Sequence, residues 1–339
     1  MDTTAPQFVV HDATFEAIIG PNPSARLVAQ SEDGSAVYHE ACIYHPATRS
    51  IFVTSNQLLN SNGDNHILLS RIYVDDTQSD GPRTESVTPT ELSSSFLNGG
   101  INYGDDILLC AQGSTKLSDP IGLVVVSSSN TQEYRTLLTS FYDIPFNSVN
   151  DVVVHPEDGS IWFTDPCYGY HQGIRPPPQL PNQVYRFDPA TKSVRAVADG
   201  FVRPNGICFS PDAKTVYVTD TGAIHGSPEV PFDPAGPSHI YAFDLADDNF
   251  LTRRRLFAYA PGKIPDGIKC DTKGNVYSGC ADGINVWNTT GVLLGVVEVK
   301  GGVANFCFGE QGRIYACNET KFWEVQLNGT DVKGALLGL

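Results

Sequence analysis

The sequence predicts an all-β protein of about six four-stranded repeats, an organisation typical of a propeller or a solenoid. A polar turn followed by a short apolar run recurs in HPATRSIFVTS (45–55), HPEDGSIWFTD (155–165), SPDAKTVYVTD (210–220), CDTKGNVYSGC (270–280) and FGEQGRIYACN (308–318), with a weaker copy in NYGDDILLCAQ (102–112). Most copies begin about 54–60 residues apart, and the last step is shorter. The 31 Gly and 23 Pro suit a chain rich in turns.

The repeat favours one domain over residues 1–339, because 339 residues are enough for a single large core. Residues 1–35 precede the first clear repeat, and we expect them to supply a lead-in region with the outer strand that closes the ring. No apolar run reaches about 18 residues, so no membrane-spanning segment is predicted.

The net charge of −16 is acidic and excludes several partners. Such a field repels phosphate backbones, which argues against nucleic acid, and we expect no membrane partner. We expect a small-molecule substrate instead, and the oligomeric state stays open.

Eight cysteines are present without a CxxC pair, so their spacing does not indicate zinc, and their even number leaves disulfides open. Three glycosylation sequons begin at Asn288, Asn318 and Asn328. Residues 1–4 lack the features of a signal peptide. We expect a secreted glycoprotein whose signal peptide is not part of this sequence, with a cytoplasmic location as the alternative.

Two long loops, 166–182 and 222–238, each follow a strand that ends in Thr-Asp. Loops at one rim of a propeller cover its central pocket, and long loops carry function more often than short ones. Surface insertion is the alternative interpretation of both.

A second pattern lies in phase with the repeat. Glu40, Asn150, Asn205 and Asp266 each precede the turn of their own repeat by five residues. If the repeats are related by rotation about an axis, these four side chains face that axis at one height.

All four side chains offer oxygen ligands, and together they carry two negative charges. Hard oxygen ligands without sulfur or nitrogen favour Ca²⁺ or Mg²⁺, and Ca²⁺ tolerates irregular geometry. The alternative is that the Asn-Gly and Asp-Gly pairs only form turns.

Three segments, NDVVVHPEDGSIWFTDPCYGY, RPNGICFSPDAKTVYVTDTG and PDGIKCDTKGNVYSG, resemble the superfamily of senescence marker protein (regucalcin), gluconolactonase and luciferin-regenerating enzyme. The resemblance runs from about residue 36 to about residue 325. Within the superfamily the chain is most similar to fungal-type lactonohydrolases, through TDPCYGYHQGIRPPPQLPNQVYRF and the sequons. The resemblance implies a six-bladed β-propeller with a metal site in the central tunnel.

The same resemblance implies roles for the in-phase residues. Glu40, Asn205 and Asp266 match metal ligands, and Asn150 matches a residue that meets metal or substrate. Asp266 also matches a proposed general base, so Asp266 and Asn150 are the expected catalytic residues. We expect Ca²⁺, with Mg²⁺, Mn²⁺ or Zn²⁺ as substitutes.

Four further residues are candidates for substrate binding: His39, Tyr168, Arg175 and His225. His39 adjoins Glu40, and the other three lie in the two long loops. For each of them a packing or surface role is the alternative.

The sequence therefore predicts a calcium-dependent lactonase, in which the dication polarises the lactone carbonyl and an activated water attacks it. No G-x-S-x-G motif supports a serine hydrolase. Two alternatives remain: a fungal natural-product enzyme of cyclase or cycloaddition type on the same scaffold, and a calcium-binding module without catalysis.

Overall fold

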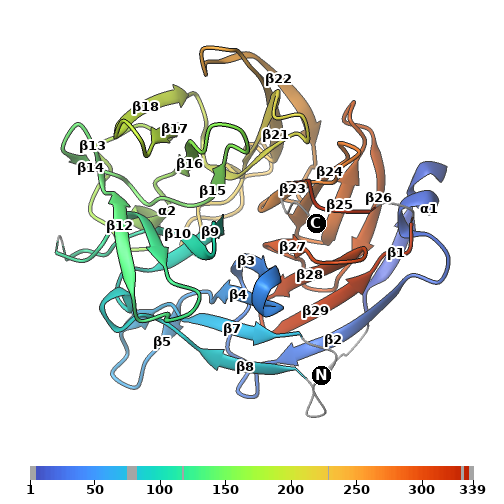
Figure 1. Cartoon of the computed structure of the whole chain (residues 1–339), viewed down its shortest axis with the longest axis horizontal. Coiled ribbons are helices and arrows are strands. Elements are labelled where there is room, and N and C mark those ends of the chain that lie inside the picture. The colour runs from blue at the N-terminus through green and yellow to red at the C-terminus, as the bar shows by residue number, and fades with distance from the viewer. Residues whose placement is uncertain (1–4, 75–81, 117, 228, 330–331, 336–339) are drawn as a thin grey trace.

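Six antiparallel sheets stand around a common centre in the computed structural model, which describes residues 5–74, 82–116, 118–227, 229–329 and 332–335 (Figure 1). The arrangement confirms the predicted all-β six-bladed β-propeller. Residues 1–4, on which the signal-peptide expectation bears, lie outside the described residues. In the part of the chain that is described, no helix is long and apolar enough to span a bilayer.

Each sheet is called a blade below, and its innermost strand is given first. Blade 1 has β3 (Glu40–His45), β4 (Ser50–Thr54), β7 (Leu69–Tyr73) and β8 (Arg83–Ser86). Blade 2 has β9 (Leu97–Tyr103), β10 (Asp106–Ala111), β11 (Gly122–Val126) and β12 (Tyr134–Leu138). Blade 3 has β15 (Val152–Val154), β16 (Ile161–Asp165), β17 (Gln183–Asp188) and β18 (Ser193–Ala198).

Blade 4 has β19 (Pro204–Phe209), β20 (Thr215–Asp220), β21 (His239–Leu245) and β22 (Leu251–Tyr259). Blade 5 has β23 (Ile268–Cys270), β24 (Val276–Cys280), β25 (Gly283–Trp287), β26 (Leu293–Glu298) and β1 (Gln7–Val10). Blade 6 has β27 (Phe306–Phe308), β28 (Arg313–Asn318), β29 (Lys321–Gln326) and β2 (Ser24–Gln30).

Smaller elements lie outside the blades. They are the hairpins β5 (Leu58–Leu59) with β6 (Asn65–His66) and β13 (Ser140–Phe141) with β14 (Ile144–Pro145), the helices α1 (Ala13–Ile19) and α2 (Tyr168–His171), and the 3-10 turns Pro46–Thr48 and Thr90–Leu92.

Strands from the beginning and the end of the chain pair in blade 6. Strand β2 pairs antiparallel with β29, so that Ser24 lies opposite Gln326. Strand β1 adds a fifth strand to blade 5 by pairing with β26. The outer strands of the last two blades therefore come from the first 30 residues, which closes the ring by main-chain hydrogen bonds.

The recurring turn of the sequence joins the first and second strands of a blade. In each of the five clear copies, at least one residue of this turn has a positive φ. Glycine supplies that left-handed conformation at Gly159, Gly274 and Gly312, whereas Arg49 and Ala213 adopt it despite a Cβ. The Gly in the repeated phrase is thus explained by backbone geometry.

The core lies between neighbouring blades. In β16, Trp162 packs with Phe209 of blade 4, with ring centroids 5.7 Å apart, whereas Phe163 faces a cluster that includes Leu108 of blade 2. All four side chains are buried. Alternate residues of a strand point to opposite faces, so each blade contributes to two core layers. Burial of such a side chain stabilises the fold by about 1.5–3 kcal/mol.

All eight cysteines are buried and free, so none of them forms a disulfide in this fold. The sequon residue Asn318 is also buried, and its amide donates to the carbonyls of Lys300 and Gly302. A glycan on this nitrogen would break at least one of these hydrogen bonds and would have to occupy a buried position. The third sequon includes Thr330, which lies outside the described residues.

Candidate active site

The four in-phase residues occupy the same place in four blades, where the innermost strand begins. Glu40 is the first residue of β3 and Asn205 is the second residue of β19. Asn150 and Asp266 each lie two residues ahead of the innermost strand of their blade, β15 and β23. Glu40, Asn150 and Asn205 are buried.

Main-chain groups of these residues are tied to the neighbouring blade. The Thr164 hydroxyl donates to the Asn205 carbonyl (2.7 Å), and the Thr219 hydroxyl donates to the Asp266 carbonyl (3.0 Å). The amide of Gly99 donates to the Asn150 carbonyl (2.8 Å). These bonds fix the heights of the in-phase residues relative to one another.

The glycines that follow Asn205 and Asp266 serve close packing. A Cβ on Gly206 would lie 2.3 Å from the Asp266 carbonyl oxygen, and one on Gly267 would lie 2.4 Å from Asn305 Oδ1. Neither glycine has a positive φ. The Asn-Gly and Asp-Gly pairs therefore do not form left-handed turns here; they let adjacent blades approach each other.

Sequence reasoning missed a fifth member of this set. Asn98 is the second residue of β9 in blade 2, and its carbonyl accepts from the Thr54 hydroxyl (3.1 Å). It precedes Tyr103 by the same five residues. The turn of blade 2 is shorter than the other turns, so the shared offset is difficult to recognise in the sequence. In blade 6, Ala304 precedes Gly309 by the same five residues. We call Glu40, Asn98, Asn150, Asn205 and Asp266 the oxygen ring below.

The oxygen ring contains buried acceptors that the protein does not satisfy. Within the described residues, Oδ1 of Asn98, Asn150 and Asp266 is buried without a hydrogen-bond partner. Glu40 Oε2 accepts from Asn305 Nδ2 (2.8 Å), and the Asp266 carboxylate accepts from the Asn205 amide. Buried polar atoms are normally paired, and an orphaned oxygen costs about 1–3 kcal/mol.

Both carboxylates of the oxygen ring have raised pKa values. Burial raises the pKa of Glu40, and burial together with the charge of Glu40 raises the pKa of Asp266 well above its usual range. Two buried carboxylates that repel each other are stabilised by a positive charge between them.

The donor set fits a hard cation. No group of three or more His, Cys, Asp or Glu side chains in the described part of the chain is placed to hold a metal. The oxygen ring instead combines two carboxylates with three amides. Three of these five side chains have an oxygen without a hydrogen-bond partner among the described residues. All-oxygen sets of this kind suit Ca²⁺ rather than zinc or copper.

His39 lies beside the oxygen ring and is paired with an acid. Its Nδ1 is 2.6 Å from Glu319 Oε1. Burial alone would lower the pKa of His39, but the hydrogen bond to Glu319 and the charges of Glu319, Glu40 and Asp266 raise it to about 9. At neutral pH this imidazole is therefore a hydrogen-bond donor and not a base.

A second group of polar side chains comes from blades 3 and 4. It consists of Tyr168, Arg203 and His225, and we call it the wall below. The buried Tyr168 hydroxyl bonds the Thr221 hydroxyl, and burial and the charge of Asp266 raise its pKa. Arg203 Nη2 is 2.7 Å from His225 Nδ1, and the Arg203 Cζ atom lies 5.9 Å from the Tyr168 ring. Tyr168 and His225 are thus brought into one wall, as parts of the two long loops.

Arg203 itself was not singled out from the sequence, although it lies two residues before Asn205. It is buried, and its Nε has no partner among the described residues. A buried guanidinium N–H without an acceptor is a candidate donor to a substrate oxygen.

Arg175 is held differently. Its guanidinium donates to the carbonyls of Asn147 (3.0 Å), Ser114 (2.7 Å) and Phe146 (3.1 Å). Three main-chain carbonyls engage its Nε, Nη1 and Nη2, so the packing role is the one that this geometry favours for Arg175.

The Thr-Asp ends of β16 and β20 anchor the wall. Asp165 accepts from the amides of Asn147 and Ser148, and Asp220 accepts from those of Val202 and Arg203. Burial raises the pKa of Asp165 to about 7, against these amide hydrogen bonds. The repeated Thr-Asp therefore fixes Asn205 and Asp266 of the oxygen ring as well as the segments before β15 and β19.

The loops at this rim border a cavity of about 420 Å³. Its lining includes Asn56, Gln57, His171 and Gln172, and the Gln57 amide donates to the Gln172 side chain (3.1 Å). Burial and the charge of Arg203 lower the pKa of His171. The described lining is polar, and it borders the loops without including the oxygen ring, Tyr168 or Arg203.

Comparison with known proteins agrees with this architecture. Residues 77–317 match the family model described as SMP-30/Gluconolactonase/LRE-like region. Lactonohydrolase oryL of Aspergillus oryzae is 30% identical over 320 residues, which cover 88% of this chain and 69% of that protein. Gluconolactonase of Zymomonas mobilis is 28% identical over 197 residues, which cover 54% of this chain and 51% of that protein.

The structure of XC5397 from Xanthomonas campestris, described as a gluconolactonase, has a TM-score of 0.75 with this chain at 25% identity. The match covers 96% of both chains. From the family model and these relatives, the chain belongs to the SMP-30/gluconolactonase/LRE-like family.

Proposed function

We propose that the protein hydrolyses a small polar lactone, of the hydroxy-acid or aldonate type, with Ca²⁺ held by Glu40, Asn150, Asn205 and Asp266. The observation that carries the proposal is the set of buried, unpartnered oxygens on Asn150 and Asp266 beside the Glu40 carboxylate. The relatives named lactonohydrolase and gluconolactonase support the same reaction class.

The chain's own groups divide the work of the reaction. A bound dication supplies Lewis-acid polarisation of the lactone carbonyl. Asp266 would accept the proton of the attacking water with the carboxylate oxygen that does not hold the cation. His39, protonated beside Glu319, donates a hydrogen bond to the oxygen that gains negative charge. Arg203, through the Nε that has no partner among the described residues, and Tyr168 orient the substrate.

The polar rim favours hydrolysis of a polar lactone over the natural-product alternative. A cyclase or cycloaddition site needs an apolar pocket for a hydrocarbon substrate, whereas the described lining of the rim cavity is rich in amide side chains. A calcium-binding module without catalysis has no use for the buried donors of Arg203 and His39.

The experiment follows lactone opening by a pH indicator, with glucono-δ-lactone and pantolactone as probes. We expect chelation by EDTA to abolish the activity and added calcium to restore it. We expect Asp266→Asn to lose at least about 100-fold in kcat, as is common when a general base is removed. Asp247→Asn removes an exposed carboxylate and serves as the matched control.

Activity that survives both chelation and Asp266→Asn would overturn the metal and the base together. Tight calcium binding without turnover on any lactone would favour the calcium-binding module.

A further inference from the structure

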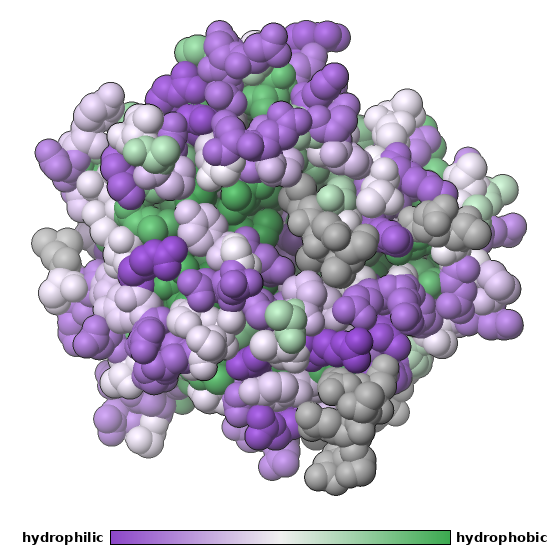
Figure 2. Space-filling view, in the orientation of Figure 1, coloured by the Kyte–Doolittle hydropathy of each residue, from purple (hydrophilic) through white to green (hydrophobic). Residues whose placement is uncertain are grey.

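A second cavity, of about 330 Å³, lies at the other end of the innermost strands. Its wall comes from later positions of the strands that carry the oxygen ring: Ile43 is three residues after Glu40, and Lys269 is three residues after Asp266. No member of the oxygen ring lines it. On the face in Figure 2, hydrophobic residues appear in the hollow near the centre, inside a mostly hydrophilic rim.

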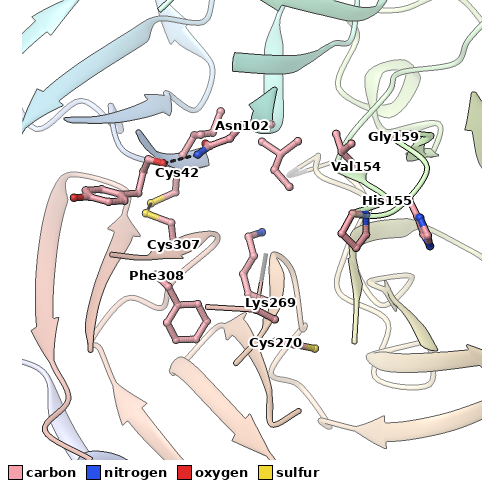
Figure 3. Close-up of a pocket in the computed structure, with 15 residues that line it drawn as sticks. Cys42, Asn102, Val154, His155, Gly159, Lys269, Cys270, Cys307 and Phe308 are labelled. Atoms are coloured by element: carbon pink, nitrogen blue, oxygen red, sulfur yellow. Dashed lines mark hydrogen bonds between the residues drawn. The ribbon is translucent and has the colours of Figure 1, made fainter. Parts of the chain in front are cut away.

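Lys269 projects into the middle of this cavity (Figure 3). Its neighbours in β23, Ile268 and Cys270, are buried in the layer between blades, so the alternation of the strand turns Lys269 toward the central channel. Its side chain is the only Lys, Arg, Asp or Glu among the described lining residues.

The ammonium group of Lys269 has no hydrogen bond or ion pair with the described residues. The charge of Lys269 lowers the pKa values of two carboxylates, Glu40 and Asp151, whereas burial raises them. Both are engaged elsewhere: Glu40 accepts from Asn305, and Asp151 accepts from the amides of Val152 and Ile207. Three N–H donors of Lys269 therefore remain for a ligand or water.

Most of the remaining wall is apolar, with Asn102, His155 and Tyr44 as its other polar side chains. Ile43, Ile101, Val154 and Phe308 contribute hydrocarbon surface, and burial raises the pKa of the Cys307 thiol, which keeps it neutral. A single ammonium in a mostly apolar cavity of this volume matches an organic anion with one charged end and an apolar body.

We propose that this cavity is a second binding site, which takes a monocarboxylate with an aliphatic or aromatic body. The carboxylate binds Lys269 Nζ, and the body packs on Ile43, Val154 and Phe308. A phosphate is a poorer match because the described lining offers neither an arginine fork nor a helix N-terminus to share its charge.

Titration calorimetry with sodium octanoate tests the proposal on the full chain at saturating calcium. We expect octanoate to bind the wild-type protein, and Lys269→Met to weaken binding at least tenfold. Lys269→Arg should retain binding because it keeps the charge. Lys214→Met removes an exposed lysine and is the matched control, expected to bind like the wild type.

Two further measurements test whether the charge of the ligand is required and whether it binds in this cavity. Octan-1-ol, which has the same body without the charge, should bind at least tenfold more weakly than octanoate. Val154→Phe should fill the cavity and abolish octanoate binding while Lys269 stays in place. If Lys269→Met does not fold, Val154→Phe and the comparison with octan-1-ol still test the proposal.

Absence of octanoate binding to the wild type would overturn the proposal. So would equal binding to Lys269→Met, or equal affinity for octanol. Because none of these measurements follows lactone opening, their failure is distinct from failure of the lactonase proposal.

Discussion

Replacement of Thr219 by valine tests whether blade-to-blade hydrogen bonds hold the oxygen ring. The Thr219 hydroxyl is buried, accepts from the Gly206 amide (2.7 Å) and donates to the Asp266 carbonyl (3.0 Å). Valine keeps the branched shape, so the change removes two hydrogen bonds without opening a cavity. Two buried groups left unpaired at about 1–3 kcal/mol each predict a loss of about 2–6 kcal/mol in the free energy of unfolding.

Urea unfolding measures this loss, as a lower midpoint at an unchanged slope. Thr215→Val is the matched control, because it lies on the same strand and its hydroxyl forms no hydrogen bond with the described residues. The control should change the free energy of unfolding by less than about 0.5 kcal/mol. If Thr219→Val falls within that range as well, the hydrogen bonds do not hold Asp266 and the reasoning is wrong.

Three other predictions concern packing, charge and modification. Gly206→Ala should destabilise the fold by at least about 2 kcal/mol, because its Cβ would lie 2.3 Å from the Asp266 carbonyl oxygen; thermal unfolding measures it. Burial and the charge of Arg203 lower the pKa of His225, so the stability that this histidine contributes is present above about pH 6.5 and lost below it. Arg203→Met should raise the pKa of His225, as read from its ring-proton NMR signals. Asn318 should stay unglycosylated in protein secreted from yeast, as shown by peptide mass mapping, because its buried amide is hydrogen-bonded.

Matched controls accompany these three experiments. Gly104→Ala adds a Cβ where nothing lies within 4 Å, so only the strain of its positive φ, about 1 kcal/mol, remains. Arg195→Met removes an arginine on the outer strand β18 and should leave the pKa of His225 unchanged. Occupied Asn318 or an unshifted His225 in Arg203→Met would contradict the respective argument.

The repeat predicted the fold because each copy carries its own hairpin signal. The period placed the second strands of all six blades, and the Thr-Asp strand ends marked the two loops that form one wall of the site. Strand β1 is different: it pairs with β26, about 290 residues away, and no local pattern marks that partner.

The oxygen ring was predicted in four of its five members because the offset of five is a local property. Asn98 was not predicted because blade 2 has a shorter turn. Arg203 was not predicted because a buried arginine beside a proline produces no periodic pattern in the sequence. Whether Arg175 faces a ligand or main-chain carbonyls depends on the path of a proline-rich loop, which short-range patterns do not determine.

The pairing of β2 with β29 has a consequence for how the chain reaches its native state. Ser24 and Gln326 become neighbours only after every intervening blade has been synthesised. Until then β2 has no partner strand. An unpaired strand or sheet edge can form hydrogen bonds with another chain and so promote aggregation. Contacts of such large sequence separation form slowly, so the period before ring closure is when aggregation competes with folding.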